Sequence, residues 1–197
     1  MKNFKIIDFR FAEATDEHDV KYNQIGAWSR LFEYPYVINF IKMNKLKGFD
    51  ITEIHNTSWG FEGIHVTFRD ELDKLGTSIH SDIRNSEFRD TYYYDITKEN
   101  KEFEKKFDFV VNVSTIEHLN TVGDRLKAIE NLMKQVKAGG YLILTFDYPR
   151  VNLNEIETLV GRKCDVPVNA LNGSNSTNPN QAYKDLNIIY LILRNNE

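Results

Sequence analysis

Two adjacent residues of the sequence, Glu117 and His118, have side chains suited to proton transfer. They follow an apolar run that ends at Val113. Because histidine titrates near neutral pH, His118 could act as a general base near a substrate hydroxyl, with Glu117 beside it. The pair also has a structural interpretation, since a glutamate at the start of a helix is stabilised by the helix dipole. The sequence leaves both interpretations open.

Polar residues recur where apolar, strand-like runs end. Besides Asn112 to His118, this holds for Glu53 to Gly60, for Asp82 and for Asp95. In open α/β sheets, ligands bind beyond the carboxyl ends of the strands, where the strand order reverses. The pattern therefore predicts one ligand site along the carboxyl edge of a sheet.

The elements that must position these residues alternate between strand-like and helix-like patterns from residue 48 onward. Strands separated by helices form βαβ units with a parallel sheet and right-handed crossovers. Gly139 and Gly140 are expected to end the helix that precedes them. The expected strands are 49–54, 77–83, 91–96, 107–113, 141–146 and 186–193, and the expected helices are 62–74 and one that carries Leu126, Ile129, Leu132, Met133 and Val136 on one face.

The first 47 residues follow a different pattern, irregular at first and then helical. Trp28, Leu31, Phe32 and Val37 recur at mostly helical spacing. Pro35 interrupts this spacing, which predicts two short helices or one kinked helix. We therefore predict an N-terminal helical cap segment over residues 1–47 and an α/β domain over residues 48–197.

Composition restricts the class of protein. The chain has 197 residues, 41% hydrophobic and 27% charged, which is typical of one globular domain. A net charge of −4 disfavours a general nucleic-acid binder. Cys164 is the only cysteine, which excludes an intrachain disulfide, and the histidines lack the spacing of a metal site. Without an apolar run of membrane length or a signal-peptide pattern, we expect a cytoplasmic protein that does not bind membranes.

Two segments together resemble a known family. Phe107-Asp-Phe-Val-Val-Asn-Val-Ser-Thr-Ile-Glu-His-Leu119 and Val136-Lys-Ala-Gly-Gly-Tyr-Leu-Ile-Leu-Thr145 look like the second half of class I S-adenosylmethionine-dependent methyltransferases. The resemblance covers roughly Phe49 to Phe146 in order. It implies S-adenosylmethionine as cofactor and a Rossmann-like, doubly wound, mostly parallel sheet of six or seven strands in a single domain. It also implies that the late strand is inserted antiparallel.

The resemblance assigns roles to the residues at the strand ends. Glu53 matches the acidic residue that starts the family's first motif, and Asp82 matches the one that binds the ribose hydroxyls. Asp95 fits the position that contacts the adenine amine. The residues that would border the methionine half of the cofactor are Asn112, Val113 and Ser114.

The first motif departs from the family pattern. In place of the usual Gly-x-Gly turn, Glu53 is followed by Ile-His-Asn-Thr-Ser-Trp, and the first glycine is Gly60. Small polar residues, including Asn56 and Ser58, could substitute for the glycines in the cofactor-binding loop. A closed pocket is the alternative, and it would make the chain a non-catalytic, methyltransferase-like binding or scaffold protein.

The substrate side is expected near the N-terminal segment and the end of the strand that runs to Phe146. Trp28, Arg30 and Tyr148 are the candidate substrate-binding residues. The spacing of Arg30 and Glu33 favours a salt bridge within one helix over a grip on an anionic substrate.

We expect methyl transfer to an oxygen or nitrogen atom of a small molecule, such as a sugar or nucleotide-linked metabolite. A nicotinamide-dependent oxidoreductase is a weaker alternative, because the Gly-x-Gly-x-x-Gly fingerprint is absent after the first strand of the alternating region.

Overall fold

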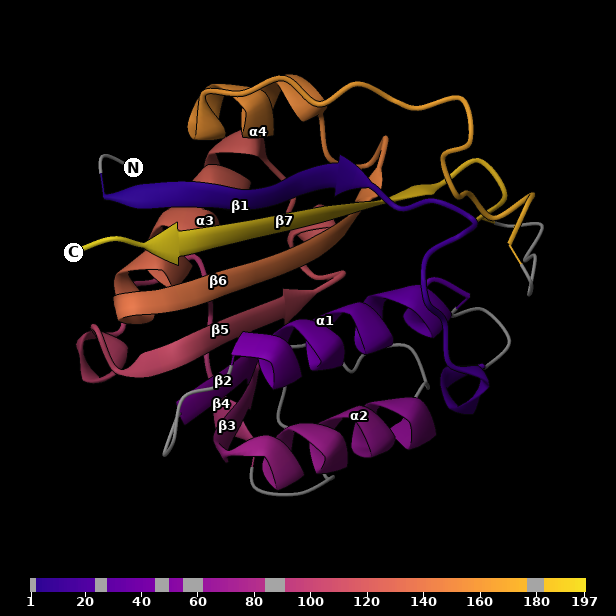
Figure 1. Cartoon of the computed structure of the whole chain (residues 1–197). Helices are drawn as coiled ribbons and strands as arrows, with labels where there is room; N and C mark the ends of the chain where they lie inside the picture. Colours follow the sequence, from indigo (N-terminus) through magenta and orange to yellow (C-terminus); the bar gives the residue numbers. More distant parts are fainter. Residues whose placement is uncertain (1–2, 24–27, 45–49, 55–61, 84–90, 177–182) are drawn as a thin grey trace.

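A mixed β-sheet forms the middle layer of the molecule (Figure 1). The computed structural model describes residues 3–23, 28–44, 50–54, 62–83, 91–176 and 183–197. Within these ranges seven strands follow the order β1-β7-β6-β5-β2-β3-β4. The strands are β1 (Phe4–Phe11), β2 (Asp50–Ile54), β3 (Thr77–Asp82), β4 (Tyr92–Tyr93), β5 (Phe107–Val113), β6 (Val136–Tyr148) and β7 (Asn187–Asn195). From β4 to β6 neighbouring strands are parallel, whereas β7 is antiparallel to both β6 and β1.

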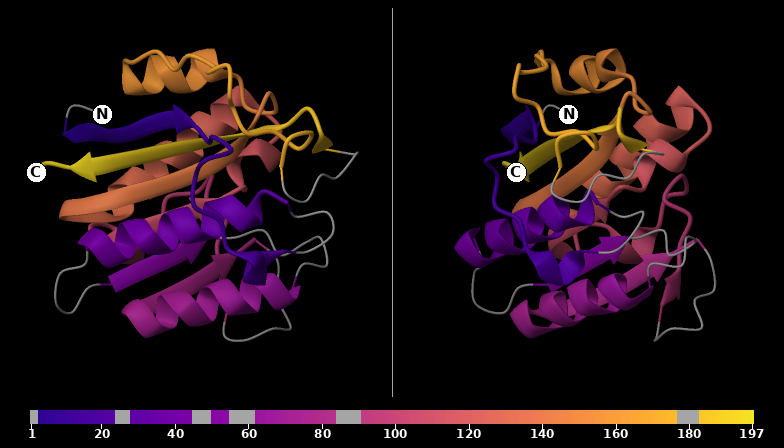
Figure 2. Two further views of the ribbon diagram at one scale, coloured as in Figure 1. Left: turned by 45° about the vertical axis from the view of Figure 1, so that its right-hand side comes forward. Right: turned by 90° about the vertical axis from the view of Figure 1, so that its right-hand side faces the viewer.

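Helices cover both faces of this sheet. The α-helices are α1 (Arg30–Asn44), α2 (Glu62–Leu75), α3 (Val122–Gln135) and α4 (Leu153–Val160), and the short 3-10 helices are η1 (Val20–Tyr22), η2 (Lys101–Phe103) and η3 (Ile116–His118). Helices α1 and α2 lie on one face, and α3 and α4 lie on the other (Figures 1 and 2). The prediction of an α/β single-domain fold is confirmed. None of the described helices has the length and apolar composition needed to cross a membrane.

The alternation of side chains along β5 shows how one strand supports both layers. Phe109, Val111 and Val113 pack in the cluster under α1 and α2, whereas Val110 belongs to the cluster under α3 and α4. Successive side chains of a strand point to opposite faces, so a strand covered on both sides needs apolar residues at nearly every position. This is why the run from Phe107 to Val113 could be predicted as a strand with its correct limits.

Helix α1 is one continuous element that contains Pro35. Proline has no backbone N–H, so the carbonyl group four residues earlier, that of Leu31, has no partner within the helix. The backbone N–H of Asp19 donates to this carbonyl oxygen at 3.0 Å. The segment before the helix thus supplies the hydrogen bond that the proline cannot make. Of the two predicted alternatives, two short helices or one kinked helix, a single helix is observed.

The N-terminal segment contributes a strand as well as a helix. The prediction for residues 1–47 missed β1, which pairs with β7 along the edge of the sheet. The register shifts between Ile6 and Asp8, so a bulge at Ile7 interrupts the twofold alternation that identifies a strand in sequence. Phe9 and Phe11 are nevertheless buried in the core. The two ends of the chain meet here, because the Asn196 backbone N–H donates to the Asn3 carbonyl oxygen at 2.7 Å.

Two other element limits differ from the prediction. Helix α3 ends at Gln135, and Gly139 and Gly140 lie inside β6 rather than at a helix end. Gly140 is placed so that a Cβ atom would lie 2.6 Å from the Asp108 carbonyl oxygen, so the glycine allows β5 and β6 to approach each other. The predicted strand 91–96 is reduced to Tyr92–Tyr93, which pairs only with the end of β3.

Candidate active site

The carboxyl ends of β3, β5 and β6 lie along one edge of the sheet, since these strands run parallel. Ser114 follows β5 directly and has a φ of 42°, a left-handed conformation that is uncommon for residues other than glycine. Its backbone N–H donates to the Thr145 carbonyl oxygen of β6 at 2.9 Å. The turn keeps the Ser114 side chain buried at the strand end.

Glu33 anchors the first turn of α1 to this edge. Its carboxylate is fully buried and accepts hydrogen bonds from the hydroxyl groups of Ser114 at 2.7 Å and of Thr145 at 2.5 Å. Arg30 donates to the second oxygen of the same carboxylate at 2.5 Å. The prediction that Arg30 and Glu33 pair within one helix is therefore confirmed. Loss of such partners from a buried carboxylate strongly destabilises the folded protein. This network therefore fixes the position of α1.

Two further acids lie close to this network, Glu117 in η3 and Asp147 near the end of β6. Burial raises the pKa of Glu117 well above its ordinary value, and the nearby charge of Asp147 raises it further. Burial also raises the pKa of Asp147 to about 7, with Glu33 contributing in the same direction. Like charges in a poorly solvated place disfavour ionisation, so ionisation of one group makes ionisation of the other less favourable.

Two arginines balance part of this negative charge. Burial alone would lower the pKa of Arg30, but the carboxylate of Glu33 and, more weakly, Asp147 and Glu117 raise it. Arg30 also donates to the Ser29 hydroxyl at 2.9 Å. Arg150 lies on the solvent side of the site, where its charge lowers the pKa of Asp147.

His118 is exposed beside the buried acids. Partial desolvation lowers its pKa, and the charges of Arg150 and Arg30 act in the same direction. A neutral imidazole at the edge of the site can accept a proton. Glu117 and His118 lie in the short helix η3, with Glu117 in its first turn, and not at the start of α3. Helix α3 begins after Thr121, whose hydroxyl caps it by accepting from the Asp124 N–H at 3.0 Å.

Comparisons with known proteins give a likeness in structure alone. No model of a protein family matches the sequence, and no curated protein matches it either. The solved structure of the N-methyltransferase NodS from Bradyrhizobium japonicum, in complex with S-adenosyl-L-homocysteine, is similar over 94% of this chain and 95% of its own, with 14% identity and a TM-score of 0.61. A Burkholderia thailandensis 1,6-didemethyltoxoflavin-N1-methyltransferase matches over 87% of this chain and 82% of its own, with 8% identity and a TM-score of 0.55.

A third structure, of the CurJ carbon methyltransferase, matches over 87% of this chain at 12% identity, with a TM-score of 0.56. The chain has the class I S-adenosylmethionine-dependent methyltransferase fold. It spans about half the length of some structures that it matches, namely 56% of CurJ and 51% of Streptomyces venezuelae DesVI.

In this methyltransferase fold, the residues predicted to bind the cofactor lie at several strand ends. Asp82, which ends β3, is 1% exposed, and Asn112 of β5 is fully buried. Val113 belongs to the hydrophobic core under α1 and α2. Asp95 holds a turn, because one of its oxygens accepts from the backbone N–H and the hydroxyl of Thr97 at 2.9 and 2.7 Å.

The predicted first motif is only partly visible. Glu53 lies in β2, where its backbone is in register with His80 of β3 and Val111 of β5. Asn56, Ser58 and Gly60 lie outside the described residues. Their assignment to the cofactor stays a prediction.

The three candidate substrate residues occupy different surroundings. Trp28 is 2% exposed and packs in a hydrophobic cluster with residues of α1 and β7. Arg30 belongs to the acidic network described above. Tyr148 is partly buried, and its ring meets that of Phe11 edge to face. Only Arg30 is therefore seen next to the buried acids, and the binding roles of the other two stay predictions.

Sequence reasoning did not foresee the central place of Glu33 and Thr145. The available signal was a glutamate within the apolar stretch Leu-Phe-Glu-Tyr-Pro-Tyr-Val, on a helix that must be buried. A buried charged residue is found only with partners. The partners themselves come from residues more than 80 positions away, at Ser114 and Thr145.

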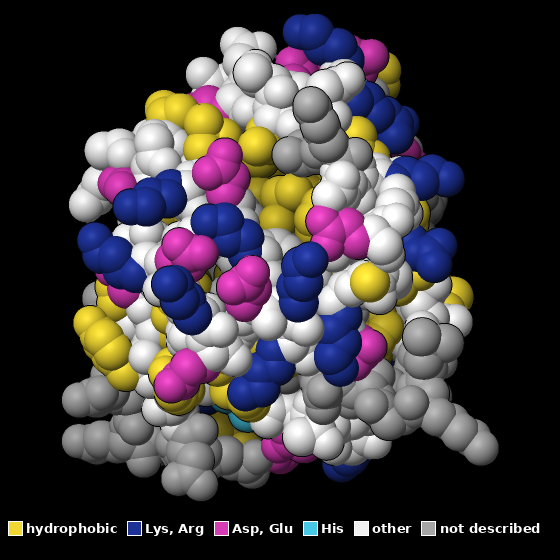
Figure 3. Space-filling view, turned by 90° about the vertical axis from the view of Figure 1, so that its left-hand side faces the viewer, with side chains coloured by type: hydrophobic (Ala, Val, Ile, Leu, Met, Phe, Trp, Pro, Cys, Tyr) yellow, Lys and Arg dark blue, Asp and Glu magenta, His cyan; other side chains and the backbone are white. Residues whose placement is uncertain are grey.

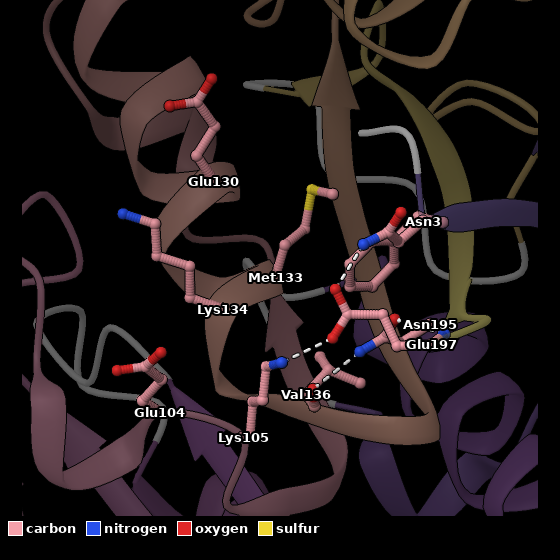
Figure 4. Close-up of a pocket in the computed structure, with 10 residues that line it drawn as sticks. Asn3, Glu104, Lys105, Glu130, Met133, Lys134, Val136, Asn195 and Glu197 are labelled. Atoms are coloured by element: carbon pink, nitrogen blue, oxygen red, sulfur yellow. Dashed lines mark hydrogen bonds and ion pairs between the residues drawn. The ribbon is translucent and has the colours of Figure 1, made fainter.

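A separate cavity of about 320 Å³ lies at the opposite edge of the sheet, close to both chain ends (Figure 4). Lys105 donates to Glu197 at 2.6 Å within it, and Asn3 donates to the same carboxylate. Basic and acidic side chains are interspersed over the side of the molecule that carries the chain ends (Figure 3). The contacts of Glu197 with Lys105 and Asn3 join the C-terminal end of the chain to the rest of the fold, which favours a structural role for this region.

Proposed function

We propose that this chain transfers a methyl group from S-adenosylmethionine to an oxygen or nitrogen atom of a small molecule. The observation that carries the proposal is the group of buried acids, Glu117 and Asp147, at the carboxyl edge of a sheet with the methyltransferase fold. This edge is where ligands bind in open α/β sheets. Similarity to NodS over nearly the whole length of both chains supports the proposal.

The described residues of the cofactor side suit S-adenosylmethionine chemically. The carboxylate of Asp82, at the end of β3, is the type of group that accepts hydrogen bonds from two ribose hydroxyls. The amide of Asn112 and the backbone around Ser114 provide neutral polar groups one strand further. One carboxylate oxygen of Asp95 accepts the two hydrogen bonds from Thr97 that form the turn. We assign the second oxygen to the adenine amine.

The chemistry divides between cofactor and chain. When bound, S-adenosylmethionine supplies a methyl group that leaves a positively charged sulfur atom, and the bonding electrons stay on sulfur. The chain binds the acceptor near Glu117 and Asp147 and receives its proton. His118, exposed beside them, passes the proton to solvent. The Glu33 network holds α1 against the edge, which keeps water away from the buried acids.

Calorimetric titration with S-adenosylhomocysteine tests the proposal. We expect the wild-type chain to bind, and Asp82→Asn to weaken binding by about 1.5–3 kcal/mol, as for one lost hydrogen bond to a charged group. Asp165→Asn, which changes an exposed carboxylate, is the matched control and should bind like the wild type. Absence of binding by the wild type would favour a scaffold role. A rise in melting temperature with NADH but not with S-adenosylhomocysteine would favour an oxidoreductase.

A further inference from the structure

Glu117 carries a buried carboxylate at the carboxyl edge of the sheet. The residue is 8% exposed, and neither of its carboxylate oxygens has a hydrogen-bond partner among the residues that the structure describes. The backbone N–H of Glu117 itself acts against the rise in pKa that burial causes. An acceptor buried without a partner costs about 1–3 kcal/mol, and more when it is charged. Such a group in a native fold calls for an explanation, and a ligand that supplies the missing donor is one.

Asp147 presents a second unsatisfied oxygen toward the same place. One of its carboxylate oxygens is buried without a partner among the described residues. The two elements that carry these acids, η3 and β6, lie against each other. The charge of Asp147 also raises the pKa of Glu117, so the two carboxyl groups are near neighbours. Two elements thus bring unpaired buried acceptors into one region of the site.

The remaining charges around this space leave it negative. Helix α1 contributes Arg30 and Glu33, which are hydrogen-bonded to each other and cancel. The exposed Arg150 and His118 border the space on its solvent side. Within the described residues, Glu117 and Asp147 form no salt bridge, and the charges of Arg30 and Arg150 offset theirs only in part.

This arrangement selects among ligand classes. A phosphate or carboxylate would be repelled by the two acids and would bring further acceptors. A hydroxyl group brings a single donor and no charge. No group of three or more potential metal ligands occurs in the described ranges. An ammonium group brings a positive charge and three N–H donors, which matches the unpaired oxygens.

We infer that the methyl acceptor is a primary or secondary amine, which binds in its ammonium form between Glu117 and Asp147. This inference rests on the proposed function and narrows its substrate class. The bound ammonium transfers one proton to a carboxylate of the pair: an N–H bond breaks, an O–H bond forms, and the nitrogen keeps its electron pair for attack. The carboxyl groups are suited to this step because burial brings their affinity for a proton closer to that of the amine.

Binding of three probes of equal size tests the inference without requiring turnover. Benzylammonium, benzyl alcohol and benzoate are titrated into the protein and followed by NMR, with and without S-adenosylhomocysteine. We expect benzylammonium to bind more tightly than the alcohol and the benzoate. Glu117→Gln should weaken benzylammonium binding roughly 10- to 100-fold, the factor for one hydrogen bond to a charged group. The exposed Glu130→Gln should leave it unchanged.

Each result decides one point. Equal or tighter binding of the alcohol or the benzoate overturns the inference, as does an unchanged affinity in Glu117→Gln. Asp147→Asn is the second variant, in case Glu117→Gln does not fold, and the same weakening is expected. If S-adenosylhomocysteine binds and benzylammonium does not, the amine inference fails while the cofactor proposal stands. If only benzylammonium binds, in a manner that depends on Glu117, the amine site stands and methyl transfer is rejected.

Discussion

Three carboxyl groups in two kinds of surroundings meet at the carboxyl edge of this sheet. Glu33 is satisfied by two hydroxyl groups and an arginine, and it holds α1 in place. Both oxygens of Glu117 and one oxygen of Asp147 lack a hydrogen-bond partner among the described residues, and both groups have raised pKa values. Acid groups with the same chemistry thus acquire separate roles from their environment alone, one structural and the other two available for proton transfer.

The raised pKa of Asp147 predicts how stability changes with pH. Burial is the main cause of the rise of this pKa to about 7, and the charge of Glu33 adds to it. The charges of Arg30 and Arg150 act in the opposite direction. The pKa of Glu117 is raised as well. The folded state therefore keeps the proton where the unfolded chain has lost it. The stabilisation is complete below about pH 4 and is lost as the pH rises to about 7. Asp147→Asn cannot ionise, so its stability relative to the wild type should increase by about 1–3 kcal/mol across this interval.

Urea unfolding at a series of pH values measures this difference. The matched control is Asp165→Asn, which removes the same charge at an exposed position and should follow the wild-type profile. A constant difference between Asp147→Asn and the wild type from pH 4 to pH 8 would contradict the assignment of a raised pKa to Asp147.

At the scale of elements, the close contact of β5 and β6 determines the position of the site. Their register brings Val113 beside Thr145, so that the residues after β5 meet the last residues of β6. At the other end of β6, Gly140 lies against the backbone of Asp108. This glycine is remote from the acids, but the pairing that it allows sets the register on which they depend.

An alanine at position 140 should destabilise the protein through this pairing. Its Cβ atom would lie 2.6 Å from the Asp108 carbonyl oxygen and 3.0 Å from a Val136 methyl group, so the strands would have to separate. We expect Gly140→Ala to lower the free energy of unfolding by about 1–3 kcal/mol, measured by urea denaturation.

Gly123→Ala is the matched control, since its Cβ atom would meet only the Thr121 hydroxyl, at 3.8 Å, within a helix. This variant should be neutral or more stable by up to about 1 kcal/mol. Equal effects of the two substitutions would show that the contact between Gly140 and Asp108 is not limiting.

One side of the sheet is formed by two strands, one from each end of the chain. β7 lies between β6 and β1, and it pairs with both in antiparallel fashion. Phe9 and Phe11 of β1 contribute to the core under α3 and α4. The N-terminal residues are therefore part of the sheet that carries the site, although the site itself lies among α1, β5 and β6.

Removal of residues 1–11 should abolish cooperative folding. The deletion exposes one edge of β7 and takes Phe9 and Phe11 from the core, and each large side chain removed from a core costs about 3–5 kcal/mol. That loss is comparable to the entire stability of a typical domain. Thermal unfolding followed by circular dichroism should show no sharp transition.

The control variant keeps the strand and changes its exposed surface. Ile7 is 41% exposed at the bulge, so Ile7→Thr should alter stability by about 0.5 kcal/mol or less. A cooperative transition near that of the wild type in the truncated chain would contradict the role assigned to β1.

By itself, the sequence determined the elements whose signals are local. The limits of β5 could be read from its run of apolar residues, and α2 was predicted within one residue of its observed end. The polar residues at strand ends indicated the edge that carries the site, because a parallel sheet brings those ends together. Glu117 was recognised as a candidate for this reason, although not as an unsatisfied group.

Only the tertiary structure decided the features that depend on distant residues. β1 could not be predicted because the bulge at Ile7 hides its alternation and its partner is β7 at the other end of the chain. The Glu33 network joins α1 to residues of β6 more than 100 positions away. Whether a buried acid is satisfied depends on every group that packs around it. In the part of the chain that the structure describes, Glu117 and one oxygen of Asp147 are buried without a hydrogen-bond partner, and this is the property on which the proposed amine site depends.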